Sequence, residues 1–181
     1  AVAGLACAAA PEDIAPPTKL EANEFSFVEN SGNTNPYKTI TSTSSSELEN
    51  LWVTGSGAGS KATGYWVDSD GQEATFTNLG NIYVTAVDGA NSWSQRAIGA
   101  ADGATAINKG TIVVQNAYGM TVGSDKNGST PATIINEGSI AVYETGAAIE
   151  LGGVKSSTAE NKGQIYVGKP SASDGAFTIG V

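Results

Sequence analysis

The chain of 181 residues contains no histidine and only one cysteine, and each scarcity excludes a kind of chemistry. Histidine is the commonest general base and metal ligand, so its absence excludes Ser-His-Asp and Cys-His catalytic sites and histidine-ligated zinc. The single cysteine, Cys7, cannot form a disulfide within the chain. The fold must therefore be stabilised by its own packing and hydrogen bonds.

Basic residues are also scarce. The chain has nine lysines and arginines against 18 acids, a formal net charge of −9, and Arg96 is its only arginine. Proteins neutralise nucleic-acid phosphates with clustered lysine and arginine, so we expect no nucleic-acid partner. The same scarcity disfavours an acidic membrane surface. No stretch approaches the roughly 18 to 20 apolar residues that span a bilayer, so we expect no membrane insertion.

Glycine-rich segments do not supply a cofactor site. Residues 55–60 (Gly-Ser-Gly-Ala-Gly-Ser) precede Lys61 and Ala62, and they lack the Gly-Lys-(Ser/Thr) ending of a phosphate-binding loop. The calcium-binding repeat Gly-Gly-x-Gly-x-Asp does not occur either. We therefore expect that the chain is not an enzyme and has no catalytic residues, no metal site and no cofactor.

What the sequence does contain is an internal repeat. Its pattern is (Ala/Ser)-Thr-x-x-Asn-x-Gly-x-Ile-x-Val, and it occurs at residues 74–84, 104–114, 132–142 and 157–167. The repeated asparagines, Asn78, Asn108, Asn136 and Asn161, are separated by 30, 28 and 25 residues. Repeats of about 20 to 30 residues built from short β segments are typical of solenoids, in which each repeat is one turn.

The repeated unit predicts two local structures. Gly-x-Ile-x-Val alternates with a period of two, which places isoleucine and valine on the inward face of a strand. Asn-x-Gly is typical of a corner, since asparagine tolerates the left-handed region and glycine takes a positive φ without steric cost. Stacked copies would place the four asparagines in a column, with each amide bonding the coils above and below it.

A second strand, bounded by glycine, follows each unit. We expect it at 119–123, 146–152 and 175–180, with counterparts at 97–99 and 64–68. Each coil then holds two or three strands, and equivalent strands of successive coils must run parallel. Crossovers in parallel sheets are strongly right-handed. The predicted fold class is therefore all-β, a right-handed parallel β-helix with an irregular N-terminal cap.

Three regions are expected along the chain: an extended leader over 1–24, a capping region over 25–63 and β-helix coils over 64–181. Ser46 followed by Glu49 resembles a capping box and predicts a short helix over about 47–52 that closes the open end. The last strand ends where a fifth unit should begin. We therefore also expect the chain to be an N-terminal fragment of a longer protein.

The longest gap between strands, from Thr85 to Arg96, is the main candidate for a binding loop, because insertions in solenoids map to one face. Within it Asp88, Trp93 and Arg96 are the candidate binding residues, since tryptophan and arginine are enriched in interaction hot spots. The alternative is that this loop folds down onto the coils. Trp66 lies on a strand, where a role at the end of the core and an exposed role are equally compatible with the pattern.

Paired carboxylates must also be weighed, because right-handed β-helices include polysaccharide lyases and hydrolases. Asp68 and Asp70 lie on the same side of a strand, and Asp88 lies one coil further along. Glycoside cleavage needs carboxylates about 5 to 10 Å apart. Three surface acids meet that condition easily by chance, and solvation explains them. A carbohydrate-active enzyme is therefore an alternative interpretation.

The Asn-x-Gly-x-Ile-x-Val units, each followed by a glycine-bounded strand and a variable loop, resemble the passenger domains of Gram-negative autotransporters, in particular the long fusobacterial-type adhesins. The resemblance covers residues 64 to 181. It implies secretion, display on the bacterial cell surface, anchoring by a C-terminal barrel that this chain lacks, and attachment to other cells. No motif of the family designates particular binding residues.

Three functions remain open at this point. The leading hypothesis is a non-catalytic surface adhesin that attaches to a protein or glycan on host or partner cells. The first alternative is a carbohydrate-active β-helix enzyme, which would act through its paired aspartates. The second alternative is a structural spacer or cap, with recognition carried by another part of a longer protein.

Overall fold

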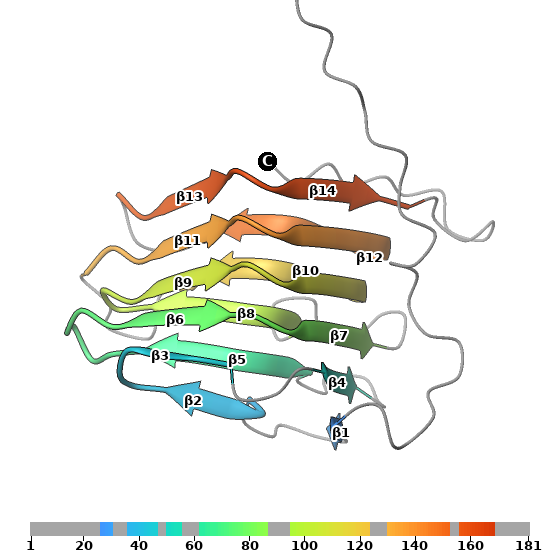
Figure 1. Cartoon of the computed structure of the whole chain (residues 1–181), viewed down its shortest axis with the longest axis horizontal. Coiled ribbons are helices and arrows are strands. Elements are labelled where there is room, and N and C mark those ends of the chain that lie inside the picture. The colour runs from blue at the N-terminus through green and yellow to red at the C-terminus, as the bar shows by residue number, and fades with distance from the viewer. Residues whose placement is uncertain are drawn as a thin grey trace, which may run out of the picture.

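The computed structural model describes residues 26–30, 36–46, 50–55, 62–86, 95–123, 130–152 and 156–168. All regular structure in these residues is β-strand (Figure 1). No helix in this part of the chain is long and apolar enough to cross a membrane. The expected leader over 1–24, with Cys7, and the strand expected over 175–180 lie outside the described residues.

The strands fall into three faces, each named here after one of its members. The β5 face contains β2 (Lys38–Ile40), β5 (Thr63–Asp68), β8 (Arg96–Ala101) and the second halves of β10 (Thr111–Val122) and β12 (Ser139–Leu151). The β6 face contains β3 (Ser44–Ser45), β6 (Thr75–Asn78), β9 (Thr105–Asn108), β11 (Thr133–Asn136) and β13 (Thr158–Asn161). The β7 face contains β1 (Ser26–Asn30), β4 (Asn50–Gly55), β7 (Asn81–Ala86), the first halves of β10 and β12, and β14 (Gln164–Val167).

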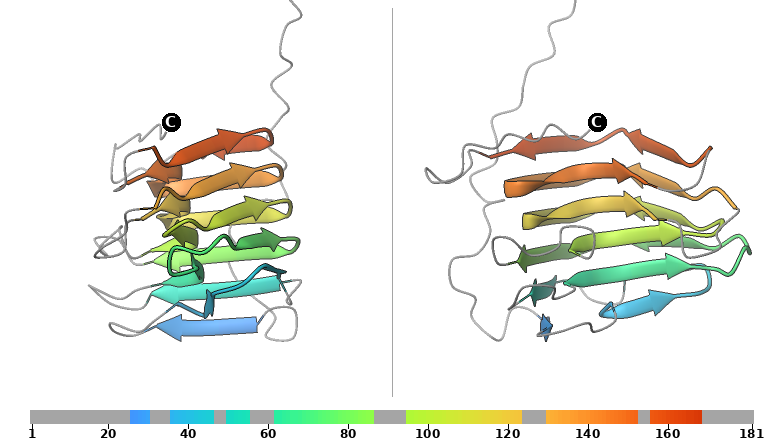
Figure 2. Two further views of the ribbon diagram at one scale, coloured as in Figure 1. Left: turned by 90° about the vertical axis from the view of Figure 1, so that its left-hand side faces the viewer. Right: turned by 180° about the vertical axis from the view of Figure 1, so that it is seen from behind.

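The chain visits the three faces in a fixed order and climbs by one strand spacing per turn. Each strand pairs in parallel with its copy in the next coil, as β5 does with β8 and β6 with β9. In Figure 1 the near strands run left to right and the far strands, β2, β5 and β8, run right to left, so the winding is right-handed. Figure 2 shows the same stack of coils from the side and from behind. The predicted all-β, right-handed parallel β-helix is confirmed.

The interior is a set of columns of like side chains. On the β7 face Ile82, Ile112, Ile140 and Ile165 lie opposite one another in successive coils. The first three are no more than 1% exposed. Burying an isoleucine or valine side chain contributes roughly 1.5 to 3 kcal/mol. These columns therefore contribute several kcal/mol, roughly, to holding successive coils together.

The helix predicted over 47–52 is wrong, because residues 50–55 form strand β4. Leu51 and Val53 point inward and are 1% and 0% exposed. They lie opposite Ile82 and Val84 of β7, so β4 is a member of the repeat. The coils thus extend into residues 25–63, the region that the sequence analysis assigned to a cap.

The asparagine column is confirmed. The Nδ2 amide of Asn78 donates to Oδ1 of Asn108 at 2.8 Å, and Asn108 donates to Asn136 at 2.8 Å. Asn136 donates in the same way to Asn161 at 2.7 Å. The first three side chains are completely buried. This inward polar column sits at the corner between the β6 and β7 faces and has a structural role.

The glycines of the Asn-x-Gly corners are required for a different reason from the one that the sequence suggested. The described glycines with positive φ are Gly71, Gly103 and Gly146, and none of them is a corner glycine. At Gly138 a Cβ atom would collide with the carbonyl oxygen of Gly110 in the coil below. The corner excludes a side chain because two backbones approach closely there, which is the second general use of glycine.

Candidate functional site

The three predicted binding residues do not meet in one described loop. Asp88 and Trp93 lie outside the described residues. Arg96 is not a loop residue, because it begins strand β8 on the β5 face. Whether Arg96 can bind a partner therefore depends on its neighbours on the outer surface of the β5 face.

Arg96 lies beside Trp66 of strand β5, on the outside of the coil. Tyr65 and Val67 on either side of Trp66 are 2% and 0% exposed and point inward, so the indole points outward. The Cζ atom of Arg96 lies 5.0 Å from the centroid of the Trp66 ring, which is a cation–π contact. Its Nη1 donates to the hydroxyl of Thr121 at 3.0 Å.

Glycine makes this arrangement possible. Gly99 of β8 lies directly opposite Trp66 in the sheet. A Cβ atom at Gly99 would collide with the indole and would lie 3.1 Å from Cδ of Arg96. The absence of a side chain therefore allows the indole and the guanidinium to lie flat against the outer surface of the sheet.

The guanidinium group of Arg96 is partly buried. Burial lowers the pKa of Arg96, and attraction to Glu150 and then to Tyr118 opposes that shift. Glu150 lies opposite Thr121 in the next coil. Burial raises the pKa of the Glu150 carboxyl, and attraction to Arg96 opposes that shift in turn. We call Trp66, Arg96, Thr121 and Glu150 the Trp66–Arg96 cluster.

Replacing Glu150 with glutamine is expected to raise the Tm by about 1 to 2 °C at pH 7 and to leave it unchanged at pH 4. The pKa of Glu150 is raised in the folded state. The ionised carboxylate therefore reduces stability as pH rises through that pKa, and the reduction is absent below the unfolded pKa. Thermal denaturation followed by circular dichroism measures the difference. Glu73→Gln, at an exposed acid, is the control. A lower Tm for Glu150→Gln at pH 7 would show that the attraction to Arg96 dominates instead.

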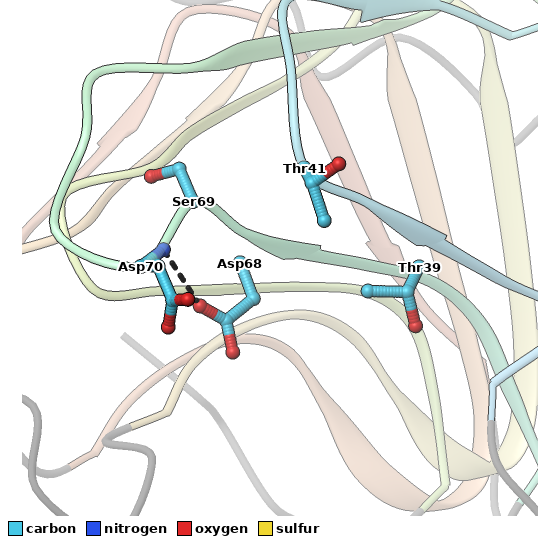
Figure 3. A pocket seen from close by; sticks show the side chains of 5 residues that line it. All are labelled: Thr39, Thr41, Asp68, Ser69 and Asp70. Atoms are coloured by element: carbon cyan, nitrogen blue, oxygen red, sulfur yellow. Dashed lines mark hydrogen bonds between the residues drawn. The ribbon is translucent and has the colours of Figure 1, made fainter.

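A polar hollow adjoins the cluster at the end of strand β5. Its volume is about 380 Å³, and its lining residues are Thr39, Thr41, Asp68, Ser69 and Asp70. Figure 3 shows these side chains around the hollow, with the two carboxylates side by side. The Asp70 amide donates to Oδ1 of Asp68 at 3.2 Å, and the indole Nε1–H of Trp66 donates to Oδ2 at 3.4 Å. Trp66 thus joins the cluster to the hollow.

The turn that carries the aspartates has an unusual backbone. Asp70 has a φ of 54° and Gly71 a φ of 77°, and Asp102 and Gly103 in the next coil have 45° and 82°. Left-handed conformations are uncommon for residues other than glycine, with aspartate and asparagine the most tolerant. The Ser69 hydroxyl lies between the backbone carbonyls of Gln72 and Asp102 and donates its one proton to either of them, which holds the turn. The turn therefore fixes the direction in which Asp70 projects.

The lining of the hollow can be compared with what glycoside cleavage and recognition each require. The enzyme hypothesis names Asp68, Asp70 and Asp88, and the last of these lies outside the described part of the chain. Among the described residues no basic side chain lines the hollow. No group of three or more His, Cys, Asp or Glu side chains in the described ranges is arranged to hold a metal ion. The hollow offers hydrogen-bond acceptors and hydroxyls around a space of small-ligand size.

The sequence analysis did not select Trp66 as the partner of Arg96. A signal was present, because a glycine within a strand often marks a close approach by another group. Gly99 follows Trp66 by one coil of 33 residues, the same separation that joins Ala62 to Gln95. The asparagine spacing of 30 residues would have placed Trp66 opposite Arg96, whereas aligning Tyr65 with Ile98 as inward residues places the indole over Gly99.

The comparisons with known proteins concern the chain as a whole. A family model described as the BigA third pectate lyase-like domain matches residues 24–180. No curated protein and no solved structure shows significant similarity to the chain. The match begins before strand β1 and includes every described coil, which agrees with the parallel β-helix seen here. The chain belongs to the family of the BigA third pectate lyase-like domain.

Proposed function

We propose that the chain is a non-catalytic attachment module of a bacterial surface protein, displayed outside the cell. Its partner is a protein or a glycan on a host or partner cell. Membership of a family named after BigA supports this proposal, as does the acidic, β-helical character of the chain. We further propose that the parent protein is an autotransporter and the chain a part of its passenger, in line with the resemblance to fusobacterial-type adhesins.

The observation that carries the proposal is the Trp66–Arg96 cluster. The fold is held by inward columns, whereas Trp66 projects outward from a strand whose neighbouring side chains are buried. Arg96 lies against its ring, and Glu150 adds the opposite charge. Tryptophan and arginine dominate interaction hot spots because they combine a large apolar area with directed hydrogen bonds. An outward Trp–Arg pair on a rigid face is therefore suited to hold a partner.

Cell attachment by the purified chain tests the proposal. Arg96→Gln is expected to weaken binding to host epithelial or partner bacterial cells at least about tenfold, measured by flow cytometry of labelled protein. Lys109→Gln is the matched control. It removes the same charge at a corner, where the lysine pairs with Glu137 at 3.6 Å and is 51% exposed. The control is expected to bind like the wild type, and circular dichroism confirms that both variants are folded.

The possible outcomes separate the three hypotheses. Equal binding by Arg96→Gln and the wild type would exclude the Trp66–Arg96 cluster as the attachment surface. A wild-type chain that binds no cell type would favour the spacer function. Release of unsaturated or reducing sugars from a panel of uronide and neutral polysaccharides, abolished by Asp68→Ala, would establish the enzyme in place of the adhesin.

A further inference from the structure

The outer surface of the β7 face carries a column of aromatic side chains that is separate from the core and from the Trp66–Arg96 cluster. The outward position of this column is occupied in successive coils by Trp52, Tyr83, Val113, Ala141 and Tyr166. Val113 and Ala141 are 1% and 0% exposed, so the exposed part of the column consists of aromatic rings. Figure 1 shows the strands that carry it, β4, β7, β10, β12 and β14, stacked one above another.

Contacts between coils fix the orientation of these rings. The indole Nε1–H of Trp52 donates to Oγ1 of Thr85 in the next coil at 2.8 Å. Tyr143, at the next outward position along β12, lies against Gly168, where an added Cβ atom would collide with its ring. The ring centroids of Tyr143 and Tyr166 are 5.8 Å apart. Rings that are already ordered lose little entropy when they bind a ligand.

The outward strand positions of the β7 face carry no charge within the described residues. Beside the aromatic column their side chains are mostly amides and hydroxyls: Asn50, Asn81, Thr111, Ser139 and Gln164 on one side, and Thr54, Thr85 and Gln115 on the other. The other two faces do carry outward charges, such as Glu150 on the β5 face and Glu160 on the β6 face. The β7 face is therefore suited to an uncharged partner.

Size decides between a protein and a narrower ligand. Strands lie about 4.8 Å apart and residues about 3.3 Å apart along a strand, so five strands and five residues make a face of roughly 300 Å². A stable protein–protein interface buries about 800 Å² on each partner. A second copy of this chain would also bring a second net charge of −9. The face is therefore too small for a stable dimer and fits an extended, narrow chain.

We infer that the β7 face binds a neutral polysaccharide that runs along the solenoid axis across several coils. The C–H faces of sugar rings pack on flat aromatic rings, while amide and hydroxyl side chains bond to the sugar hydroxyls. Trp52 and Tyr83 lie two coils away from the pair formed by Tyr143 and Tyr166, so several sugar units touch the face at once. The surface is distinct from the Trp66–Arg96 cluster, and the inference does not depend on the attachment function.

Charge disfavours acidic polysaccharides on this face. A uronate polymer would need basic side chains to offset its repulsion from a chain of formal charge −9, and the described outward positions of the β7 face supply none. Glu144, at the corner beyond Tyr143, adds a further like charge at the rim. The family's pectate lyase-like description would suggest an acidic polymer instead, so the two expectations can be separated by experiment.

Native electrophoresis of the purified chain in gels that contain a soluble polysaccharide tests the inference, because binding retards migration. Soluble β-glucan, mannan and galactan are the neutral probes, and polygalacturonate is the acidic one. We expect a neutral probe to retard the wild type and polygalacturonate to have no effect. Tyr83→Ala is expected to weaken binding about tenfold, whereas Tyr83→Phe keeps the ring and should bind within about twofold of the wild type.

Tyr118→Ala is the matched control, because Tyr118 is also a half-buried tyrosine but lies on the β5 face. It is expected to bind the polysaccharide like the wild type, and circular dichroism confirms that each variant is folded. Short oligosaccharides of the retarding polymer should compete more weakly than long ones, because they touch fewer of the rings.

Several results would overturn the inference. These are retardation by polygalacturonate alone or by no polysaccharide, unchanged binding by Tyr83→Ala, and an equal loss in Tyr118→Ala. A loss in Tyr83→Phe as large as in Tyr83→Ala would refute packing on the ring. Loss of polysaccharide binding in Arg96→Gln would move the site to the Trp66–Arg96 cluster. Dimerisation in sedimentation velocity that Tyr83→Ala abolishes, without polysaccharide binding, would assign the face to a second copy.

Discussion

Replacing Gly138 with alanine is expected to lower the free energy of unfolding by about 3 kcal/mol. The added Cβ would collide with the carbonyl oxygen of Gly110 and would lie 2.8 Å from the carbonyl carbon of Lys109. Neither atom belongs to a flexible side chain, so the coils themselves must separate to make room. That separation would stretch the bonds from the Glu137 and Gly138 amides to the Asn108 carbonyl, which are 2.7 and 2.9 Å long. Urea denaturation measures the change.

Gly71→Ala is the control that distinguishes close approach from backbone conformation. Gly71 has a φ of 77°, and the nearest atom to an added Cβ is the hydroxyl of Thr130, 3.9 Å away. The only cost there is the left-handed conformation, about 1 to 2 kcal/mol. Gly138→Ala should therefore be the more damaging variant, although its φ is ordinary. The opposite order would show that the coils can move apart at the corners and that conformation decides which positions require glycine.

The repeat in the sequence predicts most of the fold. Isoleucine and valine at fixed offsets from each asparagine predicted parallel coils, the inward columns and the asparagine ladder, and all three are present. The prediction succeeded because a solenoid converts a sequence period directly into contacts between neighbouring coils. In such a fold, the place of a residue within its repeat also determines which residues it contacts in the neighbouring coils.

The same period explains the failure over 47–52. Asn-Leu-Trp-Val-Thr-Gly at 50–55 has the pattern of Asn-Ile-Tyr-Val-Thr-Ala at 81–86, and the two strands pair in register. The capping box at Ser46 favours a helix through local hydrogen bonds only. Pairing of β4 with β7 in the stacked sheet favours a strand instead. The Ser46 hydroxyl accepts a hydrogen bond from the Leu79 amide of the next coil at 3.0 Å, so its role is to join coils.

The candidate site was harder to predict, because it depends on where side chains of different coils meet on the outer surface. Arg96 was selected for its residue type, yet its position on a strand and its contact with Trp66 follow from the register between β5 and β8. The hollow likewise needs Thr39 and Asp68 from different coils. The outward positions of the β5 face that carry Trp66 and Gly99 hold different residues in successive coils, so the repeat does not show which side chains meet there.

Replacing Asn108 with alanine is expected to lower the free energy of unfolding by about 4 kcal/mol, a large part of the 5 to 15 kcal/mol typical of a domain. The side chain is completely buried. It accepts from Asn78 at 2.8 Å and donates to Asn136 at 2.8 Å. Its removal leaves one buried acceptor without its donor and one buried donor with fewer acceptors, and it adds a cavity. Because the amides form one polarised chain, the loss is felt in the coils on both sides.

Asn81→Ala is the matched control, since Asn81 also donates to an asparagine of the neighbouring coil, Asn50, at 2.7 Å, but on the outer, half-exposed surface. Water replaces the lost bond there, so the expected cost is no more than about 1 kcal/mol. Asn108→Asp then separates the cost of the cavity from the cost of the lost amide donor, because aspartate fills the same volume as asparagine but has no amide group. Burial should raise the pKa of the introduced carboxyl above about 3.9, the ordinary value for aspartate. The Asn108→Asp variant should therefore be most stable at low pH, where the carboxyl is protonated. As pH rises the carboxyl ionises, its oxygens face Oδ1 of Asn136 without a proton between them, and the variant loses stability. Equal losses in Asn108→Ala and Asn81→Ala would mean that the inner ladder contributes no more than an exposed amide pair, and that the apolar columns alone hold the coils in register.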